Sequence, residues 1–430
     1  MATFSEKVLK ARQGMRWLPT VLTAAILLIG GAVAPCATIT VDTLSDASVL
    51  GQCSLRDAID AANSDTAVHG CAAGHGSDTI VFAKRLTGTI TLAAPLPDIQ
   101  SNLAINGPSG GGITISGNSL VGIMTIAANV EPTGITVELN NLTFIQAKSV
   151  ALGAVLNFGA LTVTDSTFMD NEASNGGAIV SLGTLTVMKS TFVGNKSLNG
   201  GAIAVRRRTR FEPASTIINS TFVGNDASQG GAISNLGATL ALINNTFSLN
   251  TAVQGGVLFN ISMGIVISKG SIFAGSTADD GNCFGEITDA GYNISDDATC
   301  LFSNTGSHNN TDPLLDPNGL ARNGGPTETI ALQSASPALD AIPVADCTDL
   351  ASPSNAITTD QRGALRPDPG EASCDIGAYE FQPFAGKANC HGKSVAALVQ
   401  QYGNLKSAAS AYGFPSVKEL QAAIETSCGG

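Results

Sequence analysis

One pattern occurs four times in succession in this chain: STFMDNEASNGGAIVS (166–181), STFVGNKSLNGGAIAV (190–205), STFVGNDASQGGAISN (220–235) and NTFSLNTAVQGGVLFN (245–260). The phenylalanine precedes the first glycine of the pair by eight residues every time, and the units start 24, 30 and 25 residues apart. Weaker copies at Phe144 and Phe273 extend the array in both directions. A period in the twenties is typical of a solenoid, in which each repeat forms one coil and stacks on the next.

Each unit consists of short β-branched runs, such as Leu185-Thr186-Val187, separated by glycine and asparagine. Three short strands and three turns fill about 24 residues at roughly 3.3 Å per strand residue. The spaced leucines and the helix of leucine-rich repeats are absent from the pattern. The sequence therefore predicts an all-β fold, a parallel β-helix.

The repeated residues have an expected place in such a coil. Equivalent positions of stacked coils lie about 4.8 Å apart, so identical side chains form columns. We expect the phenylalanines to stack inside, and the asparagines to form an amide ladder at a turn, where they tolerate the left-handed conformation. The glycine pairs permit a positive φ or a close backbone approach at the next corner. These columns are predicted to be architecture: Phe168, Phe192, Phe222, Phe247, Asn171, Asn195, Asn225 and Asn250.

Charge and composition exclude several classes of protein. Of the 430 residues, 13% are charged, and the formal net charge is −12. Residues 1–37 contribute +3, which leaves −15 on the remainder. Such an acidic chain repels phosphate backbones, so nucleic acid is not an expected partner. The low charge and the abundance of β-branched residues also exclude a disordered chain and a coiled coil.

The N-terminus has the order of a secretory signal. Residues 1–16 are basic, the stretch from Trp17 to Ala34 is almost wholly apolar, and small residues follow. We predict a cleaved signal peptide over residues 1–37, with an uncleaved membrane anchor as the alternative. No transmembrane helix is expected after cleavage. A lipid anchor at Cys36 is not expected, because Pro35 disrupts the preceding motif.

The cysteines support export. Apart from Cys36, eight cysteines fall into neighbouring pairs, and each pair brackets a local loop. No Cys-x-x-Cys spacing occurs and no histidine lies at ligand spacing, so a zinc site is not expected, nor any other cofactor. We predict disulfides within the sequential pairs, each stabilising the fold by about 3 kcal/mol. The pairs are Cys53 and Cys71, Cys283 and Cys300, Cys347 and Cys374, and Cys390 and Cys428.

Three groups of motifs resemble known modules of exported proteins. The repeats resemble those of the polymorphic outer-membrane proteins of bacteria. Segment 52–59 (QCSLRDAI) resembles an N-terminal module named after its Cys-Ser-Leu-Arg-Glu-Ala motif (CSLREA), with Asp57 in place of the glutamate. Four later segments resemble the choice-of-anchor module of type Q: 323–327 (NGGPT), 336–340 (SPALD), 360–363 (DQRG) and 374–380 (CDIGAYE). The resemblance implies an exported right-handed parallel β-helix, often surface-associated, and no known reaction.

Both ends of a solenoid need covering, because an open end exposes strand edges and apolar core. Ser54 is a good N-cap, and the residues after it have helical spacing, which predicts a short helix over the first coil. We expect the segment from Thr311 to Gln382 to close the other end. The β-helix would then span residues 38–382. In the closing segment, four side chains are predicted to form buried ion pairs, with a small metal site as the alternative: Asp340, Asp360, Arg362 and Asp375.

Residues 383–430 change in character and predict a small disulfide-clamped helical module. Three short helices are expected, over Lys393 to Gln401, Leu405 to Tyr412 and Val417 to Thr426. Ser416 and Glu419 form a capping box at the start of the third. About 40 residues bury little core, so the Cys390–Cys428 bridge is the expected support.

The third repeat is about six residues longer than its neighbours, and we place the excess near a basic stretch. Its four arginines are Arg206, Arg207, Arg208 and Arg210. On an acidic chain they are a candidate anion-binding loop. The alternative is a solvated loop that blocks edge pairing.

The sequence favours a scaffold without catalysis. Across the repeats, Glu172 aligns with Lys196, Asp226 and Thr251, a column of alternating sign rather than a metal cage. We therefore predict an adhesin-like or envelope-associated protein, secreted or at the cell surface. Its expected partner is an envelope component, a host or matrix polymer, or another surface protein. The alternative is a polysaccharide lyase or glycoside hydrolase, with its site among the carboxylates of the irregular coils: Asp279, Asp280, Glu286, Asp289, Asp296 and Asp297.

Overall fold

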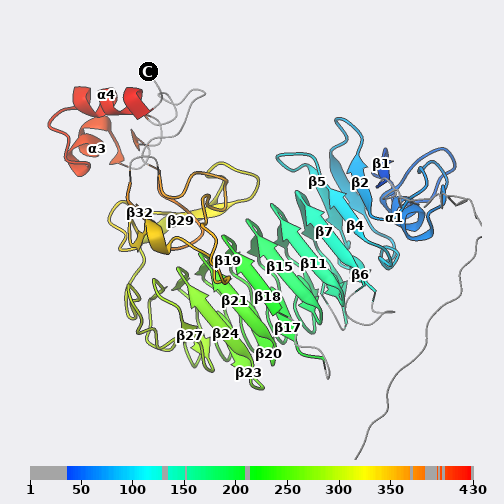
Figure 1. The fold of residues 1–430 in the computed structure, drawn as a ribbon, viewed down its shortest axis with the longest axis horizontal. Coiled ribbons are helices and arrows are strands. Elements are labelled where there is room, and N and C mark those ends of the chain that lie inside the picture. Colours follow the sequence, from blue (N-terminus) through cyan, green and yellow to red (C-terminus); the bar gives the residue numbers. More distant parts are fainter. Residues whose placement is uncertain are drawn as a thin grey trace, which may run out of the picture. The chain divides into compact units, whose positions relative to one another are not determined.

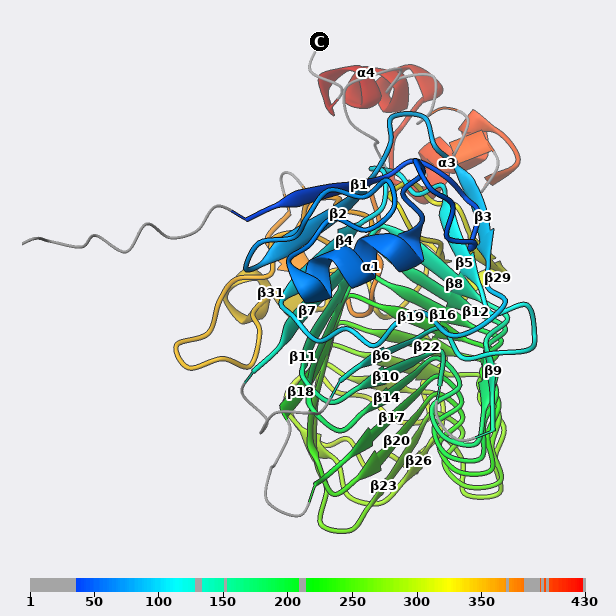
Figure 2. The ribbon, with the colours of Figure 1, turned by 90° about the vertical axis from the view of Figure 1, so that its right-hand side faces the viewer.

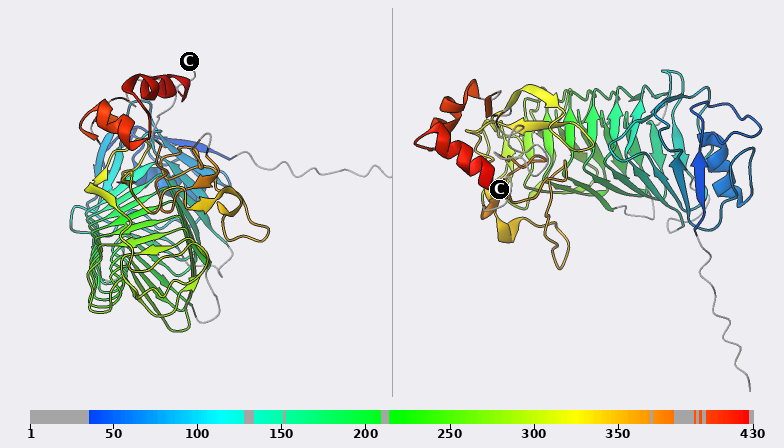
Figure 3. Two further views of the ribbon diagram at one scale, coloured as in Figure 1. Left: turned by 90° about the vertical axis from the view of Figure 1, so that its left-hand side faces the viewer. Right: turned by 90° about the horizontal axis from the view of Figure 1, so that it is seen from above.

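The chain folds into a parallel β-solenoid of about eight turns, as the repeats predict (Figure 1). The computed structural model describes residues 36–127, 134–150, 153–208, 214–368, 371–382, 395, 398–399 and 402–427. The expected signal segment, Cys36 and Ala37 excepted, lies outside these residues. A complete coil contributes one strand to each of three parallel sheets, here called sheets A, B and C in chain order, and the terminal coils lack one or two of these strands. The strands of successive coils lie side by side (Figure 3).

Sheet A has ten strands: β1 (Thr38–Val41), β2 (Asp78–Phe82), β4 (Leu103–Asn106), β7 (Thr136–Asn140), β11 (Ala160–Thr164), β15 (Thr184–Met188), β18 (Ala214–Ile218), β21 (Thr239–Ile243), β24 (Ile265–Lys269) and β27 (Thr288–Asp289). Sheet B has nine: β3 (Gly88–Thr91), β5 (Ile113–Ser116), β8 (Leu142–Ile145), β12 (Thr167–Met169), β16 (Thr191–Val193), β19 (Thr221–Val223), β22 (Thr246–Ser248), β25 (Ile272–Ala274) and β28 (Ile294–Ser295). Sheet C has seven: β6 (Met124–Ile126), β10 (Val155–Asn157), β14 (Ile179–Ser181), β17 (Ile203–Arg206), β20 (Ile233–Leu236), β23 (Leu258–Ile261) and β26 (Cys283–Phe284). At the corner between sheets B and C, β9 (Lys148–Ser149) pairs with β13 (Glu172–Ala173).

A column of phenylalanine rings runs through the core. Parallel pairing in register places Phe168 beside Phe192 and Phe192 beside Phe222. From Phe144 to Phe273, six ring centroids follow one another at five distances of 4.6–5.1 Å. All six rings are fully buried. The stack therefore combines the burial of large apolar side chains with aromatic contact between every pair of coils.

An amide ladder of asparagines lies beside the phenylalanine stack. The side-chain nitrogens of Asn171, Asn195 and Asn225 each donate to the side-chain oxygen of the next asparagine, at 2.9 Å. The same nitrogens donate to phenylalanine carbonyls of the preceding coil. Each buried amide is thus satisfied within the stack, which a buried polar column requires.

The left-handed positions differ in part from the expectation. At the asparagine turn the positive φ belongs to the residue before the asparagine, for example Asp170 (53°) and Leu249 (55°). The asparagine is held instead by its side-chain hydrogen bonds. The glycine pairs behave as expected. The first glycine has a positive φ, 66° at Gly200, and a Cβ on the second, Gly177, would lie 2.4 Å from the carbonyl oxygen of Gly201.

The first coil is covered by α1 (Leu55–Ser64), which lies beside β1 and β2 (Figure 2). The backbone N–H of Asp57 donates to the Ser54 hydroxyl at 3.2 Å, so Ser54 is the predicted N-cap. The apolar face of the helix buries Leu55 and Ile59 in the core. The disulfide Cys53–Cys71 joins the start of the helix to the loop that follows it.

The opposite end of the phenylalanine stack is covered by the loop of residues 296–310. The Phe302 ring meets the Phe273 ring edge-on, with centroids 5.3 Å apart. The disulfide Cys283–Cys300 fixes this loop to the last strand of sheet C. The Phe273 ring, the last of the stack, is therefore covered by the loop that directly follows the last coil in the sequence.

The segment from Thr311 to Gln382, expected across that end, lies instead along the outer face of sheet B, and we call it the strap. Its strands form two antiparallel pairs: β29 (Leu315–Ala321) with β30 (Thr329–Leu332), and β31 (Ile342–Pro343) with β32 (Ser373–Cys374). A short 3-10 helix (Val344–Asp346) follows β31, and Cys347–Cys374 ties the strap together. The strap covers an outward column of threonines, which explains its position.

Gln361 is the central contact between the strap and the coils. Its side-chain nitrogen donates to the hydroxyl of Thr191 at 2.9 Å, and its side-chain oxygen accepts from the hydroxyl of Thr221 at 2.6 Å. One coil further, the backbone N–H of Ala378 donates to the hydroxyl of Thr246 at 3.0 Å. The strap thus bridges three coils through side chains that are buried together.

Two helices are described in the C-terminal module, α3 (Leu405–Ala411) and α4 (Val417–Ser427). They agree with two of the three predicted helices. The backbone N–H of Glu419 donates to the Ser416 hydroxyl at 3.3 Å, in keeping with the capping box. The predicted Cys390–Cys428 bridge and most of the first predicted helix lie outside the described residues. The other three predicted disulfides are confirmed.

Truncation of one ring in the stack tests its contribution to stability. Phe192→Ala removes contacts to rings in two neighbouring coils and leaves a cavity, so we expect a loss of about 3–5 kcal/mol. Leu249→Ala is the matched control, because Leu249 is 60% exposed. The measurement is the urea midpoint by circular dichroism. Equal midpoints for the two variants would contradict the role of the stack.

Removal of the Gln361 side chain tests the strap. Gln361→Ala leaves two buried threonine hydroxyls without this partner, at a cost of about 1–3 kcal/mol. We expect faster hydrogen exchange in the strap, with the coils near the N-terminus unchanged. Gln382→Ala is the control, because its hydrogen bond to the carbonyl of Leu365 is exposed. Identical exchange in both variants would show that Gln361 does not hold the strap.

Candidate functional site

The repeated phenylalanines and asparagines lie inside the solenoid. The exposed fraction of each is 0%. The hydrogen bonds of the ladder asparagines are made within the stack, so these columns present nothing to a ligand. Candidate sites must therefore be sought on the outward columns, in the loops and on the strap.

The most regular outward feature lies at the corner between sheets B and C, where the loops of successive coils stack next to β9 (Figure 2). The Lys148 ammonium lies 3.1 Å from the Glu172 carboxylate, and the Lys196 ammonium lies 2.9 Å from the Asp226 carboxylate. We call this charged column, together with the exposed column two residues further along each loop, the corner ladder. A shallow cavity of about 370 Å³ lies on it, lined by Lys148, Ser149, Val150, Glu172, Ala173, Ser174, Lys196, Ser197 and Leu198.

The basic stretch lies where the longer repeat was expected to differ. The register between coils changes from 24 to 30 residues after Arg206, between β17 and β18. Arg206 donates weakly to the Asn175 side chain at 3.5 Å, and the Arg208 guanidinium lies 5.4 Å from the centre of the Phe158 ring. Arg207 is exposed, and Arg210 lies outside the described residues. Anion binding at this loop stays a prediction.

Among the carboxylates of the irregular coils, three accept hydrogen bonds from backbone N–H groups and so hold the loop of residues 296–310 in place. Asp289 accepts from the backbone N–H groups of Ser303 and Asn304. Burial alone would raise its pKa, but hydrogen bonds from backbone and side chains hold the pKa below its usual value. Asp297 and Asp296 accept from the backbone N–H groups of Asn282 and Gly275. Asp289 is therefore ionised, which does not suit a general acid.

The strap contains a buried cluster of ionic side chains. Arg366 and Glu380 form an ion pair at 2.9 Å with both side chains 0% exposed, and Arg362 pairs with Asp360 at 2.7 Å. Asp375 accepts from the backbone N–H of Asp340 at 2.8 Å. The structure brings the four residues predicted from the sequence, Asp340, Asp360, Arg362 and Asp375, together with Arg366 and Glu380. Buried ion pairs of this kind hold a conformation more than they stabilise it.

Burial makes several of these carboxyls hard to ionise. Burial, with the charge of Glu380 as a further cause, raises the pKa of Asp368 to about 6. Burial and the charges of Asp340 and Asp368 raise the pKa of Glu371 to about 7. Burial also raises the pKa values of Asp375 and Glu380, with the charge of Glu380 as a further cause for Asp375 and the charge of Asp360 for Glu380. At neutral pH, then, the cluster retains protons.

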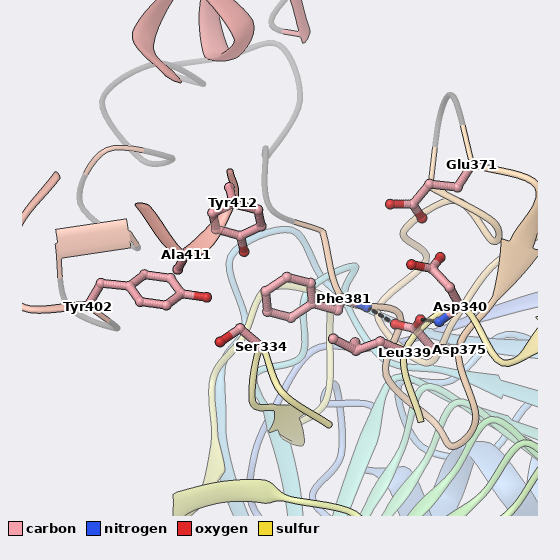
Figure 4. Close-up of a pocket in the computed structure, with 9 residues that line it drawn as sticks. All are labelled: Ser334, Leu339, Asp340, Glu371, Asp375, Phe381, Tyr402, Ala411 and Tyr412. Atoms are coloured by element: carbon pink, nitrogen blue, oxygen red, sulfur yellow. Dashed lines mark hydrogen bonds between the residues drawn. The ribbon is translucent and has the colours of Figure 1, made fainter. Parts of the chain in front are cut away.

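A cavity of about 280 Å³ lies between this cluster and aromatic side chains of the C-terminal module (Figure 4). It is lined by Ser334, Leu339, Asp340, Glu371, Asp375, Phe381, Tyr402, Ala411 and Tyr412. Figure 4 shows the carboxyls of Asp340 and Glu371 close together. Glu371 and Asp368 were not predicted from the sequence, because they lie in a stretch without a repeat or a motif. With a pKa of about 7, Glu371 has the protonation behaviour of a general acid. The described residues contain no group of three or more histidine, cysteine or carboxylate side chains placed to hold a metal ion.

Comparisons with known proteins give little further information. No family model matches the sequence, so the similarity to the modules named above stays a resemblance. The search of curated proteins found no match to the chain. A solved structure described as "a new PL6 alginate lyase complex with trisaccharide" is 12% identical, with a TM-score of 0.35. The match covers 62% of this chain and 56% of that chain, so it spans little more than half of the lyase. A likeness of this degree carries no information on activity.

The buried carboxyls predict how stability depends on pH. The pKa of Asp368 in the folded protein, about 6, lies above the ordinary value of 3.8, so folding takes up a proton. Its contribution is complete below about pH 4 and is lost as the pH rises through about 6. We expect Asp368→Asn to remove this loss, about 1–2 kcal/mol, in thermal unfolding between about pH 5 and about pH 8.

Asp279→Asn is the control for this titration, because Asp279 is exposed. This variant should retain the pH dependence of the wild type. If Asp368→Asn and the wild type lose stability equally toward alkaline pH, the buried carboxyl is not the cause.

Proposed function

We propose that the chain is an exported β-solenoid scaffold that binds a surface or extracellular partner without catalysis. The supporting observation is the distribution of its functional groups. The repeated polar side chains of the core are satisfied inside the stack, and the carboxylates Asp289 and Asp297 hold the end loop. What repeats on the accessible surface is threonine and single charges of alternating sign.

The three disulfides suit an oxidising compartment outside the cytoplasm. Among the described residues, no helix combines the length and the apolar character needed to span a membrane. Cys36 is exposed and forms no disulfide. An envelope component, a host or matrix polymer and another surface protein are the proposed kinds of partner.

The alternative is a carbohydrate-active enzyme with its acid in the strap cavity. One observation favours it, the pKa of about 7 for Glu371 beside Asp340. The most regular accessible face argues against it, because each carboxylate of the corner ladder, Glu172 and Asp226, is paired with a lysine ammonium. We therefore prefer the scaffold.

Incubation of the purified mature chain with a panel of uronic-acid polymers, with and without calcium, separates the two functions. We expect no unsaturated and no shortened products by absorbance and by size-exclusion chromatography. A commercial lyase on each polymer is the positive control. Products that disappear in Glu371→Gln would establish the enzyme and overturn the scaffold proposal.

A further inference from the structure

The charges on the corner ladder alternate along four successive coils. Lys148, Glu172, Lys196 and Asp226 follow one another as plus, minus, plus and minus. The next coil has the uncharged Thr251 at this position. All four charged side chains are accessible, with exposed fractions of 53%, 54%, 65% and 43%. The ladder has no net charge, so it offers little attraction to a uniformly charged polymer.

The neighbouring column, two residues further along each coil, alternates in size. Large apolar and small polar side chains follow one another, and the three apolar ones are exposed by 96%, 57% and 57%. In order along the solenoid the residues are Val150, Ser174, Leu198, Ser228 and Val253. Val150 and Leu198 line the shallow cavity together with charged side chains of the ladder, so the two columns belong to one surface.

The alternation of charge and the alternation of size both become complementary when a second copy of the ladder, running in the opposite direction, faces the first. A two-fold axis between the coils of Glu172 and Lys196 places Lys148 of one copy opposite Asp226 of the other. The same axis places Glu172 opposite Lys196, so four pairs of opposite charge form. In the neighbouring column Leu198 lies opposite Ser174, where a large side chain meets a small one. A two-fold contact requires this kind of self-complementary patch.

We propose that a second copy of this chain docks antiparallel on the corner ladder. The proposal rests on the scaffold function, since it names the partner of that surface. Four coils span only about 14 Å, and exposed ion pairs contribute little each, so the dimer is weak and sensitive to salt. The opposite charges determine which coils of the two copies face each other, and the exposed apolar side chains become buried in the contact.

Charge reversal at the central pair tests the proposal. Lys196→Glu places like charges opposite each other twice in a homodimer, and so does Glu172→Lys. We expect each variant alone to self-associate about tenfold more weakly than the wild type in sedimentation equilibrium. An equimolar mixture of the two variants restores opposite charges at every position, so association should return.

Lys84→Glu is the matched control, because it makes the same charge change at an exposed lysine outside the ladder. It should associate like the wild type. Circular dichroism of each variant shows that the solenoid is intact. The proposal is overturned if the wild type is a monomer at the highest soluble concentration, or if mixing the two variants fails to restore association. Either result leaves the scaffold function to be decided by the polymer experiment.

Discussion

In-register pairing between successive coils is the constraint on which the rest of this structure depends. A parallel strand places each side chain directly beside its equivalent in the next coil. A polar residue in the core can then be tolerated only if its equivalents hydrogen-bond to one another. The asparagine ladder meets this condition at 2.9 Å per contact, and the phenylalanine rings fill the space next to it.

The same register creates the outer surface. Threonines recur on the outer face of sheet B because they alternate with the core phenylalanines along each strand and repeat with the same spacing from coil to coil. Where the strap covers them, at Thr191, Thr221 and Thr246, their hydroxyls and the strap satisfy each other. Where nothing in the described chain covers the corner, side chains of opposite sign and unequal size alternate. A repeat that builds a core therefore also builds a long, regular outer surface.

The strap adds a different kind of interaction. Its cluster holds two arginines, Arg362 and Arg366, against a larger number of carboxyls. Because these carboxyls are buried, protons stay on Glu371 and Asp375 near neutral pH. Its attachment to the coils combines the Gln361 amide and threonine hydroxyls with other side-chain hydrogen bonds, such as that of Asn219 to the carbonyl of Thr359, and with an apolar cluster around Ile272. The coils are held by repetition, whereas the strap is held by specific contacts that occur once.

The sequence by itself determined the solenoid, its coil length, its buried columns, the N-terminal helix and three disulfides, because each of these depends on neighbours in the chain or on a fixed period. It also showed the alternating charges from Glu172 to Asp226. Only the tertiary structure decided where the strap lies, which ring covers the end of the stack, and that Asp368, Glu371 and Glu380 share one cluster. The strap contacts join residues about 140 positions apart, such as Thr221 and Gln361, and no local pattern encodes such a pairing.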